Sequence, residues 1–211
     1  MTKHTSRTVL IAAAAIIASA CSGAPPADDP APAQSADANE LPPPGYGTLR
    51  QDDFTIPLVA GRLQIKVTPL AEGVIRLAAP DTYNRLHGMV ASRSDRIRQM
   101  AQTNGIRGEP QVFLVSFFTY DQQVAYDPSA LQVLNQGIQY FQRGILPLTP
   151  EWGRGQVKQQ QTLSALYLFD SAIDLEVLTE VQYGDARSMA WSRIIRVLQA
   201  ERGRVISRSK G

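Results

Sequence analysis

The sequence predicts a mainly β, α+β domain: an immunoglobulin-like or related β-sandwich with one inserted helix at about residues 81–103 and a C-terminal helix at about residues 186–202. Two observations support this class. Short apolar or alternating segments are separated by Gly, Pro, Asn and Asp, which is typical of strands joined by turns. Only two stretches repeat apolar residues at steps of three and four, the helical spacing. Eight or so short strands with two helices indicate a sandwich.

The clearest strand covers residues 62–68, where Leu63, Ile65 and Val67 alternate with polar residues, as in a strand with one buried face. Residues 110–120 contain the unbroken run Val-Phe-Leu-Val-Ser-Phe-Phe, which indicates a central strand covered on both faces. Further strands are expected over residues 54–58, 73–77, 123–126, 131–134 and 138–143, and residues 162–169 and 175–183 are expected to form a hairpin.

Both helices are predicted from an apolar stripe. The first begins after Pro80 with Asp81 as its cap, and it ends near residues 104–105. In the second, apolar residues stand at i, i+3, i+4 and i+7, and Gly203 is expected to end the helix. The apolar positions are Tyr83, Leu86, Val90, Ile97 and Met100 in the first helix and Trp191, Ile194, Ile195 and Leu198 in the second.

The N-terminus carries an export signal. Lys3, His4 and Arg7 precede an apolar run over residues 9–18, which is about half the length of a membrane-spanning helix. The run closes with Ala18-Ser19-Ala20-Cys21. This pattern resembles the lipobox of bacterial lipoproteins, in which small residues precede a cysteine that is acylated, with palmitate for example, before cleavage on its N-terminal side. The alternative is an ordinary secretory signal followed by an incidental cysteine.

The resemblance implies a signal peptide over residues 1–20 and a lipidated Cys21. Composition then predicts a disordered Pro/Ala-rich tether, so that Cys21 and the tether cover residues 21–45, and length and strand pattern predict a single β-sandwich domain over residues 46–211. The tether would reach roughly 27 Å as a flexible coil. The expected location is the cell envelope, with the protein held on a membrane by its lipid. In a Gram-negative cell, Ser22 after the cysteine favours the periplasmic face of the outer membrane. The oligomeric state and the choice of membrane stay open.

The charge and the histidine content restrict the partners, metal sites and catalytic mechanisms that the sequence allows. Removal of Lys3 and Arg7 with the signal leaves equal numbers of basic and acidic residues, which argues against nucleic acid as a partner. His87 is then the one histidine, and no Gly-x-Ser-x-Gly motif accompanies it. One histidine and an acylated cysteine exclude a usual zinc site. We therefore expect no metal, no cofactor and no catalytic residues.

Four residues are candidates for binding: Trp152, Arg93, Arg85 and Arg96. Trp152 follows Glu151 in a Pro/Gly-rich loop and would either meet a partner or pack into the core. Arg93 falls within the apolar stripe of the first helix and is expected to reach the rim or to meet an acid such as Glu72 or Asp170. Arg85 and Arg96 lie along one edge of that helix.

Two further surfaces leave alternatives open. Basic residues gather on the outer face and at the end of the last helix, and they would form either an anionic-lipid or phosphate site or a solvated surface: Arg193, Arg196, Arg202, Arg204, Arg208 and Lys210. Residues 156–162 are rich in glutamine and would be either an exposed edge for pairing with another chain or a protected edge.

These features favour a non-enzymatic lipoprotein whose sandwich docks a protein of the envelope, as accessory lipoproteins with immunoglobulin-like domains do. One alternative is a carrier of a lipid or small hydrophobic ligand, with a pocket lined by Phe117, Phe118, Tyr167 and Phe169. A second is a carboxylate-based cell-wall hydrolase that uses Glu151, which would need another acid about 5–10 Å away.

Overall fold

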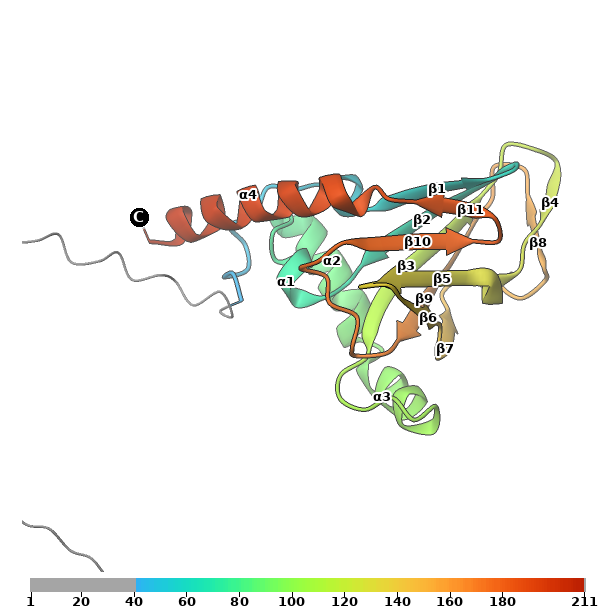
Figure 1. The fold of residues 1–211 in the computed structure, drawn as a ribbon, viewed down its shortest axis with the longest axis horizontal. Coiled ribbons are helices and arrows are strands. Elements are labelled where there is room, and N and C mark those ends of the chain that lie inside the picture. The colour runs from blue at the N-terminus through green and yellow to red at the C-terminus, as the bar shows by residue number, and fades with distance from the viewer. Residues whose placement is uncertain (1–40, 211) are drawn as a thin grey trace, which may run out of the picture. The chain divides into compact units, whose positions relative to one another are not determined.

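Two antiparallel sheets lie one over the other in the computed structural model, which describes residues 41–210 (Figure 1). The main sheet has the order β1 (Ile56–Ala60), β2 (Leu63–Pro69), β3 (Gln111–Phe118), β9 (Thr162–Phe169) and β7 (Gly144–Pro147). The second sheet has the order β11 (Ala186–Ser188), β10 (Thr179–Tyr183), β5 (Leu131–Asn135) and β6 (Ile138–Phe141). The two sheets meet along β1, which lies against β10 and β11. A third pair, β4 (Gln123–Ala125) and β8 (Gln156–Lys158), forms a separate ribbon.

The helices lie on the side of the main sheet away from the second sheet, or beside the sandwich. They are η1 (Gln51–Phe54), α1 (Glu72–Ile75), α2 (Pro80–Ala91), α3 (Ser94–Thr103), η2 (Pro128–Ala130) and α4 (Trp191–Ser209). Figure 1 shows α4 running along the edge of the sandwich and extending beyond it. The structure thus confirms the predicted α+β class, with a β-sandwich, helical structure inserted between strands and a C-terminal helix.

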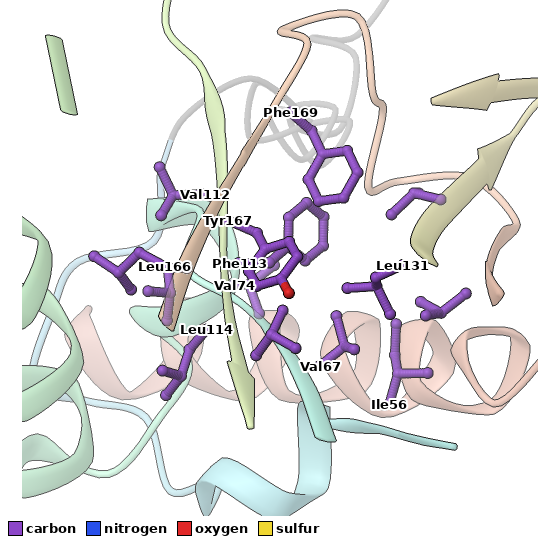
Figure 2. Packing of buried hydrophobic residues seen from close by; sticks show 14 of the residues in the cluster. Ile56, Val67, Val74, Val112, Phe113, Leu114, Leu131, Leu166, Tyr167 and Phe169 are labelled. Carbon is purple, nitrogen blue, oxygen red and sulfur yellow. The ribbon is translucent and has the colours of Figure 1, made fainter. Parts of the chain in front are cut away.

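The main sheet is buried on both faces where the helices cover it. Figure 2 shows side chains from β3 and β9 pointing alternately to the two sides, as the pleat of a strand requires. Those on the helix side are Val112, Leu114 and Leu166, and those on the side of Leu131 in the second sheet are Phe113, Tyr167 and Phe169. Further along β3 the helix-side positions become Ser116 and Phe118, which are half-buried. The apolar run predicted a central strand, and its change to Ser116 marks where the helix layer ends.

The inserted helix is two helices with a break at Arg93. Its backbone leaves the helical conformation there (φ −123°, ψ 9°), and its guanidinium donates to the Met89 carbonyl oxygen at 3.1 Å. The Ser92 hydroxyl donates to the same carbonyl at 3.3 Å. These side chains satisfy a carbonyl at the end of α2 that lacks a partner within the helix. The apolar stripe predicted one continuous helix because both halves bury the same side.

Three other sequence predictions differ from the structure. Residues 73–77 were expected as a strand, but the N–H groups of Val74 and Ile75 both donate to the Ala71 carbonyl and form the single turn α1. A run this short has no periodicity that separates a strand from a buried turn. The C-terminal helix begins at Trp191 rather than 186, because residues 186–188 pair with β10, and it continues past Gly203 to Ser209.

The segments 162–169 and 175–183 do not form a hairpin. β9 lies between β3 and β7 in the main sheet, whereas β10 pairs with β5 and β11 in the second sheet. The chain therefore crosses from one sheet to the other between these two strands. Alternating apolar residues predict strands but not the sheet that each strand joins.

Candidate functional site

A groove lies on the helix side of the main sheet, between α2, α3 and residues 106–112. It consists of two adjoining hollows of about 490 and 520 Å³ that share Val90, Glu109, Pro110 and Val112 in their lining. Its apolar lining comes from buried or half-buried side chains: Leu70, Val90, Ile97, Ala101, Ile106 and Val112. We call this feature the helix-side groove.

One end of the groove holds a group of polar side chains around Glu72. One carboxylate oxygen, Glu72 Oε2, accepts from Arg76 Nε at 2.6 Å and from the Tyr83 hydroxyl at 3.4 Å. The other oxygen, Oε1, lies 2.7 Å from His87 Nδ1. The Tyr83 and His87 rings stack with their centroids 5.2 Å apart. We call these four residues the Glu72 cluster.

The Glu72 cluster stabilises the ionised form of the Glu72 carboxyl group. Partial burial opposes ionisation of Glu72, but hydrogen bonds from Arg76 and His87 and the charge of Arg76 outweigh it, so the pKa of Glu72 is lowered. Because Nδ1 of His87 faces Glu72, Nε2 is the ring nitrogen that remains for a further hydrogen bond. The cluster can therefore present a fixed carboxylate, a guanidinium and an imidazole to whatever enters this end of the groove.

Local sequence explains how the cluster forms. Glu72 and Arg76 are four residues apart on the turn of α1 and its cap, a spacing that brings side chains together. Tyr83 and His87 are likewise four residues apart, on α2. α1 packs against α2, so the two pairs converge. In the sequence, His87 was weighed as a catalytic histidine and the cluster was missed, because residues 73–77 were assigned to a strand and α1 was not expected.

Trp152 lies in an aromatic group with Phe117, Tyr126 and Tyr167. Its ring centroid is 5.7 Å from that of Phe117, 5.6 Å from Tyr126 and 6.1 Å from Tyr167. The Gly153 N–H donates to the Tyr126 hydroxyl at 3.2 Å and fixes the loop beside the ring. Trp152 is half-buried, and these contacts correspond to the packed loop, the alternative to a binding loop.

The three predicted arginines have separate neighbours. Arg85 is exposed and donates to the Gln51 side chain at 2.6 Å. Arg93 meets neither Glu72 nor Asp170 in its hydrogen bonds but caps α2, as described above. Arg96 is exposed on α3 and borders a hollow of about 280 Å³ with Gln99 and Met100. As candidate binding residues, Arg85, Arg93, Arg96 and Trp152 remain predictions.

The residues proposed to line a carrier pocket do not share one side of the main sheet. Phe117 and Phe118 are consecutive in β3 and point to opposite faces. Phe117 and Tyr167 are fully buried and belong to the packed core. Phe118 instead stacks edge-on with the exposed Tyr120, at a centroid distance of 4.7 Å. The carrier alternative therefore has no common cavity at these four side chains.

The glutamine-rich segment is paired within the chain. Residues 156–158 form β8 against β4. The N–H groups of Gln159 and Gln160 donate to the carbonyls of Gln122 and Thr119 at 3.0 and 2.9 Å. The side of residues 156–160 that makes these bonds is thus occupied by residues 119–125, and the segment continues into β9.

No family model, curated protein or solved structure matches this chain. Within residues 41–210, none of the helices has the length and apolar character needed to span a membrane. In the same residues, no group of three or more His, Cys, Asp or Glu side chains could hold a metal ion. The signal peptide, Cys21 and most of the tether lie outside the described residues. Residues 41–45, assigned to the tether, belong to the described part, where Pro42 is buried.

Proposed function

We propose that this chain is a lipid-anchored protein of the cell envelope that acts without catalysis, by docking a segment of a partner protein in the helix-side groove. The observation that carries the proposal is the groove itself, whose two adjoining hollows have an apolar lining and which ends at the Glu72 cluster. An apolar surface with a few fixed polar groups at its rim is a common form of a peptide-binding groove.

The shape of the groove favours an extended partner segment. Its two hollows follow one another along residues 106–112. Leu41 of this chain lies at the end next to Glu72 and Gly73, 47% exposed, on a segment without regular secondary structure. An apolar side chain on an irregular segment therefore already lines this end.

The anchor is proposed from the sequence alone. Cys21 is the only cysteine in the chain and stands where the lipobox resemblance requires it. We expect Cys21→Ser to leave the protein unprocessed or released from the membrane fraction, and Ser22→Ala to leave it processed and membrane-bound. Fractionation of cells that express each variant checks this. A Cys21→Ser protein that is fully processed and still on the membrane would contradict the anchor.

The docking site is tested with a photo-reactive amino acid at Gln102 or at Gln99. Both glutamines are exposed on α3, but Gln102 borders the helix-side groove and Gln99 does not. Illumination of cells should give one discrete crosslinked product from position 102, in good yield, and little from position 99. Equal yields from both positions, or no product from 102 in protein that is correctly folded, would overturn the proposed site.

A further inference from the structure

The outer face of α4 is strongly basic. At 100° per residue, Arg193, Arg196, Arg204 and Arg208 fall within roughly a third of the helix circumference and extend over about 22 Å of its length. All four are exposed. Val197, 38% exposed, and Ala200 lie between them on the same face. The helix contains one acid, Glu201, which points inward and is fully buried.

Few of these charges are neutralised by the protein. Arg204 and Arg208 share Glu201, at 3.4 and 3.1 Å. Arg202, on the inner side, forms a two-pronged pair with Glu176. Within residues 41–210, the side chains of Arg193, Arg196 and Lys210 make no ion pair and no hydrogen bond to other side chains or to the backbone. The face therefore carries a net positive charge available to an external partner.

The chain that leads from the proposed lipid anchor enters the fold beside this helix. The N–H and the hydroxyl of Thr48 both donate to Glu201 Oε1, at 3.0 and 2.9 Å. The Arg208 guanidinium donates to the Tyr46 carbonyl oxygen. Residues 46–48 are thereby fixed against the C-terminal half of α4. The basic face and the tether's point of entry belong to the same part of the molecule.

We infer that the outer face of α4 rests on the anionic headgroups of the membrane that holds the lipid anchor. Lys and Arg side chains near an anionic bilayer surface are attracted to it, and the attraction weakens with salt. A short tether keeps the local concentration of that surface high, so a few arginines suffice. Val197 and Ala200 provide the small apolar strip that an interfacial helix inserts between headgroups. This inference rests on the proposed anchor.

The test uses the full mature, acylated protein on vesicles, with a polarity-sensitive fluorophore attached at Val197→Cys. Acylation blocks Cys21, the chain's only natural cysteine, so the introduced thiol is the one that reacts. A second protein carries the fluorophore at Ile138→Cys on β6, at the other end of the second sheet from β11. Vesicles of neutral phosphatidylcholine are compared with vesicles that also contain phosphatidylglycerol.

On the anionic vesicles, the fluorophore at residue 197 should shift to the blue and brighten by about twofold, and high salt should reverse the change. The fluorophore at residue 138 should not respond. The double variant Arg193→Glu/Arg196→Glu should abolish the response at residue 197. The matched double variant Arg107→Glu/Arg143→Glu makes the same change in net charge elsewhere on the exposed surface and should leave it intact.

Flotation of the vesicles separates failure of this inference from failure of the anchor. Protein that floats with both kinds of vesicle but shows no lipid-dependent change at residue 197 overturns the role of α4 and leaves the anchor standing. Protein that does not float with neutral vesicles overturns the anchor, and the inference with it. A response that persists in Arg193→Glu/Arg196→Glu would also overturn the proposed face.

Discussion

Glu201 shows how one residue joins the start of the folded chain to its last helix. Its carboxylate is fully buried and accepts from the backbone and hydroxyl of Thr48, while two arginines approach it from the surface. Burial of a charge is costly unless hydrogen bonds and opposite charges compensate for it. Here the compensation exceeds the cost, because the pKa of Glu201 is lowered despite its burial.

Replacing this carboxylate should weaken the fold. We expect Glu201→Gln to lower the free energy of unfolding by about 2 kcal/mol, since the amide keeps the shape but loses the charge-assisted bonds. Asp95→Asn is the matched control, because Asp95 also pairs with an arginine three residues away but is 94% exposed. That change should cost less than about 0.5 kcal/mol. Urea unfolding measures both, and equal losses would contradict the assigned role of Glu201.

The same contact makes the free energy of unfolding depend on pH. A carboxyl whose pKa is lower in the folded state than in the unfolded state stabilises the fold above its unfolded pKa, and the contribution is lost as pH falls through the folded pKa. Glu201 and Glu72 both have lowered pKa values. Unfolding free energy should therefore fall as pH is lowered below about 4.5, and Glu201→Gln should show a shallower fall. Parallel pH profiles would contradict this.

At the scale of elements, two glycines differ in how closely the surrounding chain packs against them. Gly47 lies directly under the backbone of residues 77–78, and an added Cβ would overlap the Leu77 carbonyl. Gly203 is inside α4 with open space where a Cβ would stand. The segment 46–49 and residues 77–78, which follow α1, are in contact through this close approach and through the Leu49 N–H, which donates to the Leu77 carbonyl at 3.2 Å.

Alanine at these two positions should have opposite effects. Gly47→Ala should destabilise the protein by about 2 kcal/mol, because a backbone contact must open. Gly203→Ala should stabilise it by about 0.5–1 kcal/mol, because alanine favours a helix interior. Thermal unfolding of both variants checks the pair. A destabilised Gly203→Ala would indicate that α4 needs flexibility there, contrary to its continuous helix.

Elements with a strong apolar periodicity were predicted correctly from the sequence. Elements with a short or weak pattern were not. The alternation in 62–68 and the apolar run in 110–120 correspond to β2 and β3 because packing on the core produced both patterns. β7 was missed, and residues 156–158 were expected at a sheet edge without their partner β4, since both strands are short and their pairing depends on strands distant in the sequence. Gly203 was taken as a helix end, yet the buried stripe continues through Glu201 and Val205 and maintains the helix.

At the scale of the whole molecule, the main sheet divides the fold into a core between two sheets and a layer of helices. The helix-side groove exists because α2 and α3 cover part of that face and break at Arg93. Its walls come from residues 70–76, 87–102 and 106–112, which are brought together only by the tertiary fold. No local motif marks such a site, so the sequence pointed instead to conspicuous single residues such as Trp152.

The central claim is that the helix-side groove receives a segment of a partner protein. It is tested most directly by a crosslinking pull-down of the anchored protein from its native cell, comparing wild type with Gln102→Trp and Gln99→Trp. The indole at 102 would border the helix-side groove, whereas the indole at 99, about 60° around the same helix, would border the separate hollow beside Arg96. The account predicts a stoichiometric partner that is retained by wild type and Gln99→Trp and reduced about tenfold by Gln102→Trp. A partner that binds all three proteins equally would contradict the groove as the docking site.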